Sequence, residues 1–208
     1  MLENISLFTG LDSHQQEALA ATGERRKYKQ GSIILGRGDA TNYLFVLING
    51  QVNAYVEEDN KRIILSTISQ GETFGELAMF SGEPRSANII ALQDCEVLVL
   101  QQDDINKYLP LSPDFCRNII QILAKKVNAM TEDVSCLALF DVYQRIARVL
   151  EQYSDSGVLS GLTQQDIADR VGSSREMVSR ILKDLRVGGY ISVENRRISI
   201  IKSLPKAW

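Results

Sequence analysis

Residues 163–182 of this 208-residue chain read TQQDIADRVGSSREMVSRIL. The spacing predicts two short helices that cross at a tight turn. Ala168 is small enough for a close helix crossing, and Gly172 supplies the positive φ that is easy only for glycine. Ser173 or Ser174 can cap the second helix. The pattern therefore predicts a helix-turn-helix, whose second helix enters the major groove of DNA.

A polar face remains on the second helix once its apolar positions are assigned to the core. Arginine forks pair with the O6 and N7 atoms of guanine, and a carboxylate can accept from the N4 atom of cytosine. One such pair contributes about 1–3 kcal/mol of base discrimination. The residues of this face are Arg175, Glu176, Ser179, Arg180 and Lys183.

The segments on either side of this motif extend it into a domain. Residues 141–152 predict another helix before it. After it, Tyr190–Val193 and Arg197–Ile200 alternate like two strands joined by a turn over 194–196. Helices followed by such a hairpin outline a winged helix, so we expect residues 141–208 to form one DNA-binding domain.

The charge is distributed unevenly along the chain. The net charge of −3, taken whole, argues against a nucleic-acid binder, which is usually basic. Residues 141–208, however, contain 11 Lys and Arg against 8 Asp and Glu, whereas residues 1–140 contain 12 against 18. The net charge of −3 is therefore the sum of +3 on residues 141–208 and −6 on residues 1–140, and it does not exclude a DNA-binding protein.

The segment from about Arg25 to Leu100 has a β-type pattern. Short apolar runs alternate with glycines such as Gly31, Gly50 and Gly71. No helical crossover separates the runs, which disfavours a doubly wound sheet and favours a β-sandwich, roll or barrel. We expect residues 1–112 to form this domain, with a short helical segment at the start.

From Pro113 onward, apolar residues recur at alternating intervals of three and four. This is a heptad seam, and it predicts a long helix over 113–140 with a hinge near 139–141. So narrow a seam favours the same helix of a second copy, in a parallel homodimer; packing on the chain's own domain is the alternative. Lys125 and Lys126 flank the seam and are expected on a solvated face. The seam residues are Ile120, Leu123, Val127, Met130, Val134 and Leu137.

A second motif, FGELAM at 74–79 followed by PRSA at 84–87, suits a cyclic phosphate. Glycine lets the backbone approach closely, and the amides that follow can point at an anion. Glu76 can accept from a ribose hydroxyl, and Arg85 offers a two-pronged donor to phosphate oxygens. A structural ion pair between Glu76 and Arg85 is the alternative. The predicted ligand-binding residues here are Gly75, Glu76, Leu77, Ala78, Arg85 and Ser86.

Together, the two motifs resemble the catabolite activator/fumarate-nitrate regulator (CRP/FNR) superfamily of transcription regulators, most nearly its cyclic-AMP receptor branch. SREMVSR at 174–180 resembles the recognition helix, and the motif at 74–87 resembles the phosphate-binding cassette. The resemblance runs along nearly the whole chain. It implies an α+β fold, with a β-roll (a cyclic-nucleotide-binding jelly roll) over 1–112, a dimerisation helix over 113–140 and a winged helix-turn-helix over 141–208.

The resemblance also implies roles for residues of the recognition helix. Arg175 and Arg180 would read guanines, and Glu176 the cytosine side, of a palindromic TGTGA-type site. The hydroxyl side chain sometimes found at the position of Met177 is absent. Phosphate contacts are implied for Thr163, Ser174 and Ser179.

For the effector, the resemblance points to cyclic AMP. In the cyclic-AMP-responsive members, a Thr-Ser pair on the long helix grips the adenine amino group; here the pair is Met130-Thr131. Thr131 can make one such contact, to the nucleotide in the partner's pocket, whereas Met130 cannot donate. Cyclic GMP, cyclic di-GMP or another effector, and DNA binding without a ligand, are the alternatives.

Other classes of protein find little support in the sequence. Cys95, Cys116 and Cys136 form no C-x-x-C pair, which disfavours a disulfide framework or a zinc site. With His14 as the only histidine and no cysteine before Cys95, haem and iron–sulfur sensing are disfavoured, and no nucleophile–base pair indicates an enzyme. Without a run of about 18 apolar residues, we expect a cytoplasmic protein. The resemblance implies a contact between RNA polymerase and the 152–161 loop.

Overall fold

The computed structural model describes residues 2–3, 5–59, 61–152, 158–194 and 197–205. The chain forms two compact units, Met1–Val56 with Ile64–Asn128, and Glu57–Ile63 with Ala129–Trp208. The division between them falls inside the long helix α4 (Pro113–Leu139), whose ends lie close to the predicted boundaries at 113 and 140. Those domain boundaries stay a proposal.

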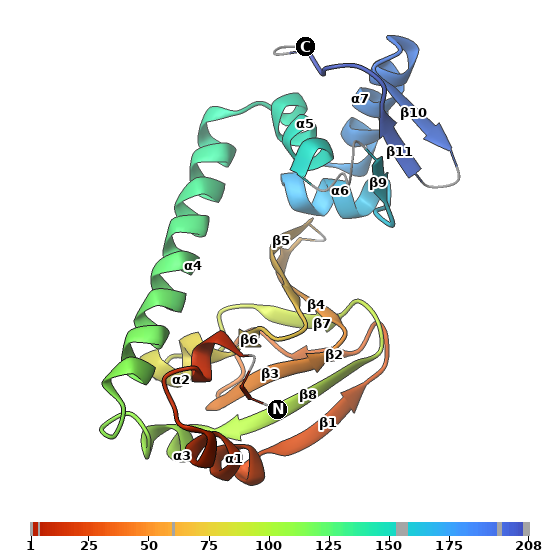
Figure 1. Cartoon of the computed structure of the whole chain (residues 1–208). Helices are drawn as coiled ribbons and strands as arrows, with labels where there is room; N and C mark the ends of the chain where they lie inside the picture. Colours follow the sequence, from red (N-terminus) through yellow and green to blue (C-terminus); the bar gives the residue numbers. More distant parts are fainter. Residues whose placement is uncertain (1, 4, 60, 153–157, 195–196, 206–208) are drawn as a thin grey trace. The chain divides into compact units, whose positions relative to one another are not determined.

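The first unit is built on two four-stranded sheets, ordered β1-β8-β3-β6 and β2-β7-β4-β5, whose described pairings are antiparallel (Figure 1). This agrees with the predicted roll. The strands are β1 (Glu24–Tyr28), β2 (Ile33–Leu35), β3 (Tyr43–Asn49), β4 (Gln51–Glu58), β5 (Lys61–Ser69), β6 (Thr73–Phe74), β7 (Asn88–Ala91) and β8 (Cys95–Gln101).

Alternate residues of β3 and β8 enter two different apolar cores, because successive side chains of a strand point to opposite faces. Phe45 and Val99 face the core that the two sheets share. Leu44 and Leu98 face a core closed by the helical segments. The helical segments of this unit, besides the start of α4, are η1 (Ser6–Phe8), α1 (Ser13–Thr22), α2 (Glu76–Ser81) and α3 (Gln102–Asn106).

The N-terminal segment is fastened to the first turn of α4. The Ser112 hydroxyl donates to the Gly10 carbonyl at 2.6 Å, and the rings of Phe8 and Phe115 stack with centroids 6.0 Å apart. A Cβ atom on Gly10 would lie 2.4 Å from the Phe115 backbone nitrogen. Only glycine permits this approach, and the contact fixes where α4 begins.

The second unit contains a winged helix. Its helices and strands are α5 (Val142–Gln152), β9 (Val158–Ser160), α6 (Gln164–Val171), α7 (Arg175–Val187), β10 (Ile191–Glu194) and β11 (Arg197–Ile200). The three strands form one sheet, ordered β10-β11-β9, and β9 was not predicted. Ala168 and Val178 are fully buried where α6 and α7 cross. Residues 195–196 of the predicted turn and 153–157 of the 152–161 loop lie outside the described residues.

The heptad seam of α4 lies open on this chain. Five of its six residues are 45–65 % exposed, and Leu123 is half-buried. An α-helix that packed its seam on its own domain would bury these side chains, whereas in the described structure most of the seam is exposed. Among the helices of the described part of the chain, none is long and apolar enough to cross a membrane.

Candidate functional site

Gly75, in the cassette at 74–87, is the residue that precedes the first turn of α2. Its φ of +86° lies in the left-handed region, which favours glycine. A Cβ atom here would lie 2.8 Å from Arg85 Nη1 and 2.9 Å from the Tyr43 carbonyl oxygen. The backbone therefore passes so close to Arg85 that any side chain at this position would collide with it.

Arg85 is 4 % exposed and ties three segments together. Its Nε donates to Thr41 Oγ1 at 2.8 Å, its Nη1 to the Gly75 carbonyl at 2.6 Å and its Nη2 to the Tyr43 carbonyl at 2.8 Å. Burial lowers the pKa of the guanidinium, while the nearby Glu76 carboxylate acts in the opposite direction. Arg85 thus holds the cassette against β3 through three hydrogen bonds to protein acceptors.

Glu76 is also 4 % exposed, and its two carboxylate oxygens differ. Oε1 accepts from Lys126 Nζ at 2.7 Å. Oε2 is buried and has no hydrogen-bond partner within the described residues. Buried polar atoms are nearly always satisfied, so an acceptor left over in a predicted ligand pocket is a position for a donor from outside the protein.

The prediction that Lys126 lies on a solvated face is wrong. Its side chain is 38 % exposed, and its ammonium reaches the buried carboxylate of Glu76. A lysine stem can run along an apolar surface while its charge reaches a polar partner, which helical spacing alone does not reveal. The alternative of a Glu76–Arg85 ion pair does not hold either, because the described ion pair of Glu76 is with Lys126.

The remaining predicted ligand-binding residues differ in their exposure to solvent. Ser86 is exposed beside the buried Arg85, Leu77 is partly exposed, and Ala78 is buried. The structure therefore brings the cassette residues together in one unit around Gly75, Glu76 and Arg85. Met130 and Thr131 belong to the second unit, and their contact with an effector stays a prediction.

Local capping explains why the helix-turn-helix forms where the sequence predicts it. Thr163 caps α6: its hydroxyl accepts from the Asp166 backbone N–H at 3.1 Å, and Asp166 Oδ2 accepts from the Thr163 backbone N–H at 2.7 Å. Gly172 ends α6 with a φ of +61°. Ser174, not Ser173, caps α7 by accepting from the Met177 backbone N–H at 3.2 Å. The cap and turn predictions are confirmed.

The polar face of α7 is available to a partner. Arg175, Arg180 and Lys183 are exposed, and no Arg or Lys of α7 forms an ion pair in the part of the chain that the structure describes. A hydrogen bond from its own backbone N–H, assisted by Ser174, lowers the pKa of Glu176. This helix therefore offers free cationic donors and one ionised acceptor.

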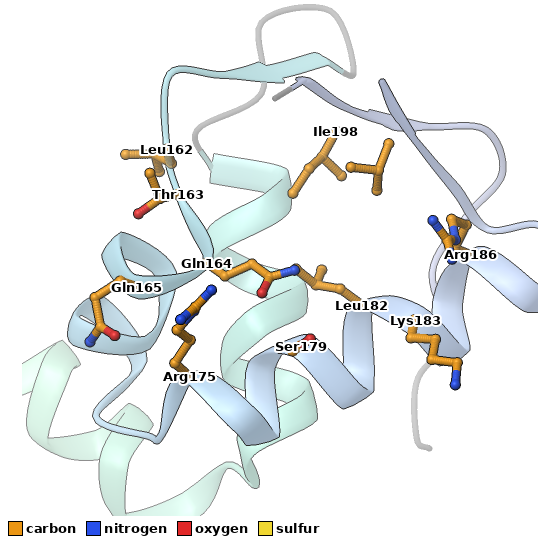
Figure 2. A pocket seen from close by; sticks show the side chains of 11 residues that line it. Leu162, Thr163, Gln164, Gln165, Arg175, Ser179, Leu182, Lys183, Arg186 and Ile198 are labelled. Atoms are coloured by element: carbon orange, nitrogen blue, oxygen red, sulfur yellow. The ribbon is translucent and has the colours of Figure 1, made fainter. Parts of the chain in front are cut away.

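A groove of about 770 Å³ runs between α7, the start of α6 and the wing strands. Figure 2 shows Arg175 near the start of α6 and Arg186 beside the strands. Four predicted DNA-binding residues line it, namely Thr163, Arg175, Ser179 and Lys183. Glu176, Arg180 and the cap Ser174 lie outside the lining. The sequence prediction missed its other lining residues, Leu162, Gln164, Gln165, Leu182, Arg186, Val193 and Ile198.

One signal could have found part of this lining. Residues 175, 179, 182, 183 and 186 recur at the three- and four-residue spacing that shares one helix face. Arg186 thus belongs to the face that begins at Arg175. The wing residues could not be placed in this way, because their position depends on how the sheet packs against α7.

Comparisons with known proteins match both halves of the chain. Residues 25–110 match the family of cyclic nucleotide-binding domains, and residues 144–205 match the Crp-like helix-turn-helix domain. No group of three or more His, Cys, Asp or Glu residues within the described ranges could hold a metal ion.

Individual relatives match over most of their length. The cAMP-activated global transcriptional regulator CRP of Pasteurella multocida (strain Pm70) is 34 % identical over 184 residues, which cover 84 % of this chain and 88 % of the relative. The cAMP-activated global transcriptional regulator Vfr of Pseudomonas aeruginosa is 32 % identical over 197 residues, 88 % of this chain and 92 % of Vfr.

Among solved structures, the c-di-GMP responsive global regulator CLP of Xanthomonas campestris superposes with a TM-score of 0.81. The two are 27 % identical, and the match covers 92 % of this chain and all of CLP. These relatives are transcription regulators and not enzymes, in agreement with the sequence prediction. With both domains matched in order and a relative at 34 % identity over most of its length, the chain belongs to the CRP/FNR family of cyclic-nucleotide-binding transcription regulators.

Proposed function

We propose that the protein is a homodimeric transcription regulator that binds a palindromic TGTGA-type site under the control of cyclic AMP. The observation that carries the effector part is the buried Glu76 Oε2, which has no partner within the described residues. The 2′-hydroxyl of a ribose is a donor of suitable size for it. The cAMP-activated relatives favour cyclic AMP over other nucleotides that carry this hydroxyl.

Binding of the cyclic phosphate requires an exchange at Arg85. The guanidinium would give up at least one of its bonds to Gly75 or Tyr43 and donate to a phosphate oxygen instead. The exposed Ser86 hydroxyl and the backbone N–H groups of Leu77 and Ala78 would add donors. Since charge-assisted bonds are the stronger kind, the exchange favours the ligand over neutral carbonyl acceptors.

Lys126 provides a link between the pocket and α4. A ribose hydroxyl at Oε2 would share the Glu76 carboxylate with the Lys126 ammonium, which occupies Oε1, and would so change how strongly that carboxylate holds Lys126. Two arrangements of α4, one with Lys126 at Glu76 and one without, would then differ in nucleotide affinity. The nucleotide would shift the population toward the arrangement it binds better.

The open seam of α4 supports the homodimer. Exposed apolar residues at a and d positions fit the same residues of a parallel partner helix. Two copies would set their α7 helices about 34 Å apart, one turn of DNA, so that Arg175, Glu176 and Arg180 of each read one half-site. Val134→Asp should convert the dimer into monomers in sedimentation experiments, whereas Gln121→Asp, off the seam, should leave it intact.

A different effector is the second candidate. Met130 stands where the cyclic-AMP-responsive members supply a hydroxyl, and the structural neighbour CLP is described as c-di-GMP responsive. Thr131 alone would then contact a base, and cyclic GMP or cyclic di-GMP would bind as well as cyclic AMP. Ligand-independent binding of DNA is the third candidate, because Arg85 already has protein acceptors. A contact of the 152–161 loop with RNA polymerase stays a prediction.

Fluorescence anisotropy on a labelled TGTGA…TCACA duplex separates these candidates. We expect tight binding with cyclic AMP, and weaker binding without it or with cyclic GMP or cyclic di-GMP. Equal binding in all four conditions would favour a ligand-independent regulator, and a response to another nucleotide would replace the effector. If the protein distinguished this duplex from a scrambled one under none of the conditions, the assigned DNA site would be wrong.

The reading residues can be tested on the same duplex. Arg180→Ala should weaken specific binding by about 1–3 kcal/mol and leave binding to a scrambled duplex largely unchanged. Equal losses on both duplexes would make Arg180 a phosphate contact and not a base reader.

A further inference from the structure

Arg186 is a cation whose role neither the recognition motif nor the family resemblance assigns. It lies in the last turn of α7, and it lines the same groove as Arg175, Ser179 and Lys183. Figure 2 shows its guanidinium beside the strands of the wing, at the end of the groove away from Arg175. The groove therefore has one cation at each end of the recognition helix.

Nothing in the described part of the protein neutralises Arg186. Its side chain is exposed and forms none of the ion pairs found within the described residues. The nearest acidic residue in the chain, Asp184, lies two positions away and so projects from roughly the opposite side of the helix. Val193 and Ile198, on the groove wall, are apolar and supply no counter-charge.

The distance along α7 decides what Arg186 can reach. Eleven residues separate it from Arg175, which corresponds to about 16 Å along the helix axis. That length equals the rise of roughly five base pairs at 3.4 Å each. For an α7 that lies along the major groove with its first turn on the bases of a five-base-pair half-site, the last turn would therefore lie at the edge of that half-site, where the phosphate backbone is the available partner.

We propose that Arg186 binds a backbone phosphate at the flank of the half-site, and that Lys183, on the same face one turn earlier, lies along the path to it. This inference rests on the proposed DNA-binding function and adds to it a contact that contributes affinity without sequence information. Phosphate contacts fix the register of a protein on the duplex, whereas base contacts specify the sequence.

The salt dependence of binding tests the contact. Each phosphate contact contributes about 0.9 to the slope of log K against log salt concentration. Because a dimer carries two copies, Arg186→Gln should lower the slope by about 1.8 on both the TGTGA palindrome and a random duplex, with their affinity ratio unchanged within twofold. Lys202→Gln is the matched control: Lys202 is exposed in the same domain and outside the groove lining, and it should leave the slope unchanged.

A truncated duplex locates the contact. Shortening the palindrome so that it ends at its outer half-site base pairs should weaken the wild-type protein and leave Arg186→Gln nearly unaffected. An unchanged slope in Arg186→Gln, or a loss confined to the palindrome, would overturn the phosphate assignment while the DNA-binding function stood. A wild-type protein that bound neither duplex would overturn both proposals. Urea unfolding should show equal stability of the variant, since the side chain is exposed.

Discussion

The cassette at 74–87 and the recognition helix hold their charged side chains in opposite ways. In the cassette, Arg85 and Glu76 are each 4 % exposed, and protein groups occupy all three arginine nitrogens and one carboxylate oxygen. On α7, Arg175 and Arg180 are exposed and have no ion-pair partner within the described residues. The reading surface can therefore meet DNA without first breaking these internal bonds, whereas a ligand at Arg85 would have to replace bonds that the protein already makes. Control of the protein by its effector would then depend on the pocket.

The same substitution at both places should give the sharpest contrast. Arg85→Met should lower the free energy of unfolding by about 3 kcal/mol, because two backbone carbonyls lose their buried donor. Arg180→Met, at an exposed position, should change it by no more than about 0.5 kcal/mol. Urea denaturation of the two variants measures both. Similar losses of unfolding free energy would mean that the hydrogen bonds of Arg85 contribute no more to stability than the exposed side chain of Arg180.

The same two variants should also differ in their response to cyclic AMP. At a temperature where the Arg85→Met variant remains folded, cyclic AMP should no longer change its affinity for DNA. Arg180→Met should still bind the nucleotide, as measured by calorimetry, although its specific DNA affinity falls. A full nucleotide response in Arg85→Met would remove Arg85 from the ligand site.

A smaller effect is expected at two glycines that share one backbone conformation. Gly71 and Gly75 both have a φ of +86°, but a Cβ atom on Gly71 meets nothing within 4 Å. Gly71→Ala should cost about 1 kcal/mol, from the left-handed conformation alone. Gly75→Ala should cost about 1–2 kcal/mol more, because its Cβ collides with Arg85 and Tyr43. Equal costs in thermal unfolding would show that the cassette yields more easily than its contacts suggest.

Loss of the caps of the reading helices should cost less than Gly75→Ala. Thr163→Ala removes a reciprocal cap and should destabilise the winged helix by about 1–2 kcal/mol. Ser174→Ala removes a single bond of 3.2 Å and should cost about 0.5–1 kcal/mol. Ser173→Ala is the control, and we expect no measurable change in unfolding followed by circular dichroism. If Ser173→Ala were the more damaging change, the cap of α7 would be assigned to the wrong serine.

Features governed by local rules could be predicted from the sequence. The turn at Gly172 and the cap at Ser174 or its neighbour each depend on a few adjacent residues, and the heptad of α4 depends on one period. The bounds of β1 could not be predicted, because its sequence, ERRKY, has no apolar alternation; the strand is defined by its pairing with β8. β6 has only two residues, too few for any pattern.

The parts of the site that depend on tertiary contacts could not be predicted from the sequence. Lys126 forms an ion pair with Glu76, 50 residues away, and no local spacing of residues predicts such a pair. Arg85 was predicted to point at a phosphate, and its three protein acceptors come from β3, the Thr41 loop and the Gly75 turn. Which donors are already occupied is a property of the folded chain and not of a motif.

The position of Lys126 on α4 has a consequence for how such a regulator can diverge. Val127, the next residue, belongs to the heptad seam, and Met130 and Thr131 follow about one turn later. A change that tunes the pocket to a new signal molecule therefore falls within a few residues of the contact that would pair the two chains. A change in ligand preference would then require substitutions on α4 that also preserve its contact with the same helix of the second copy. Ligand specificity and dimerisation would therefore evolve together on this helix.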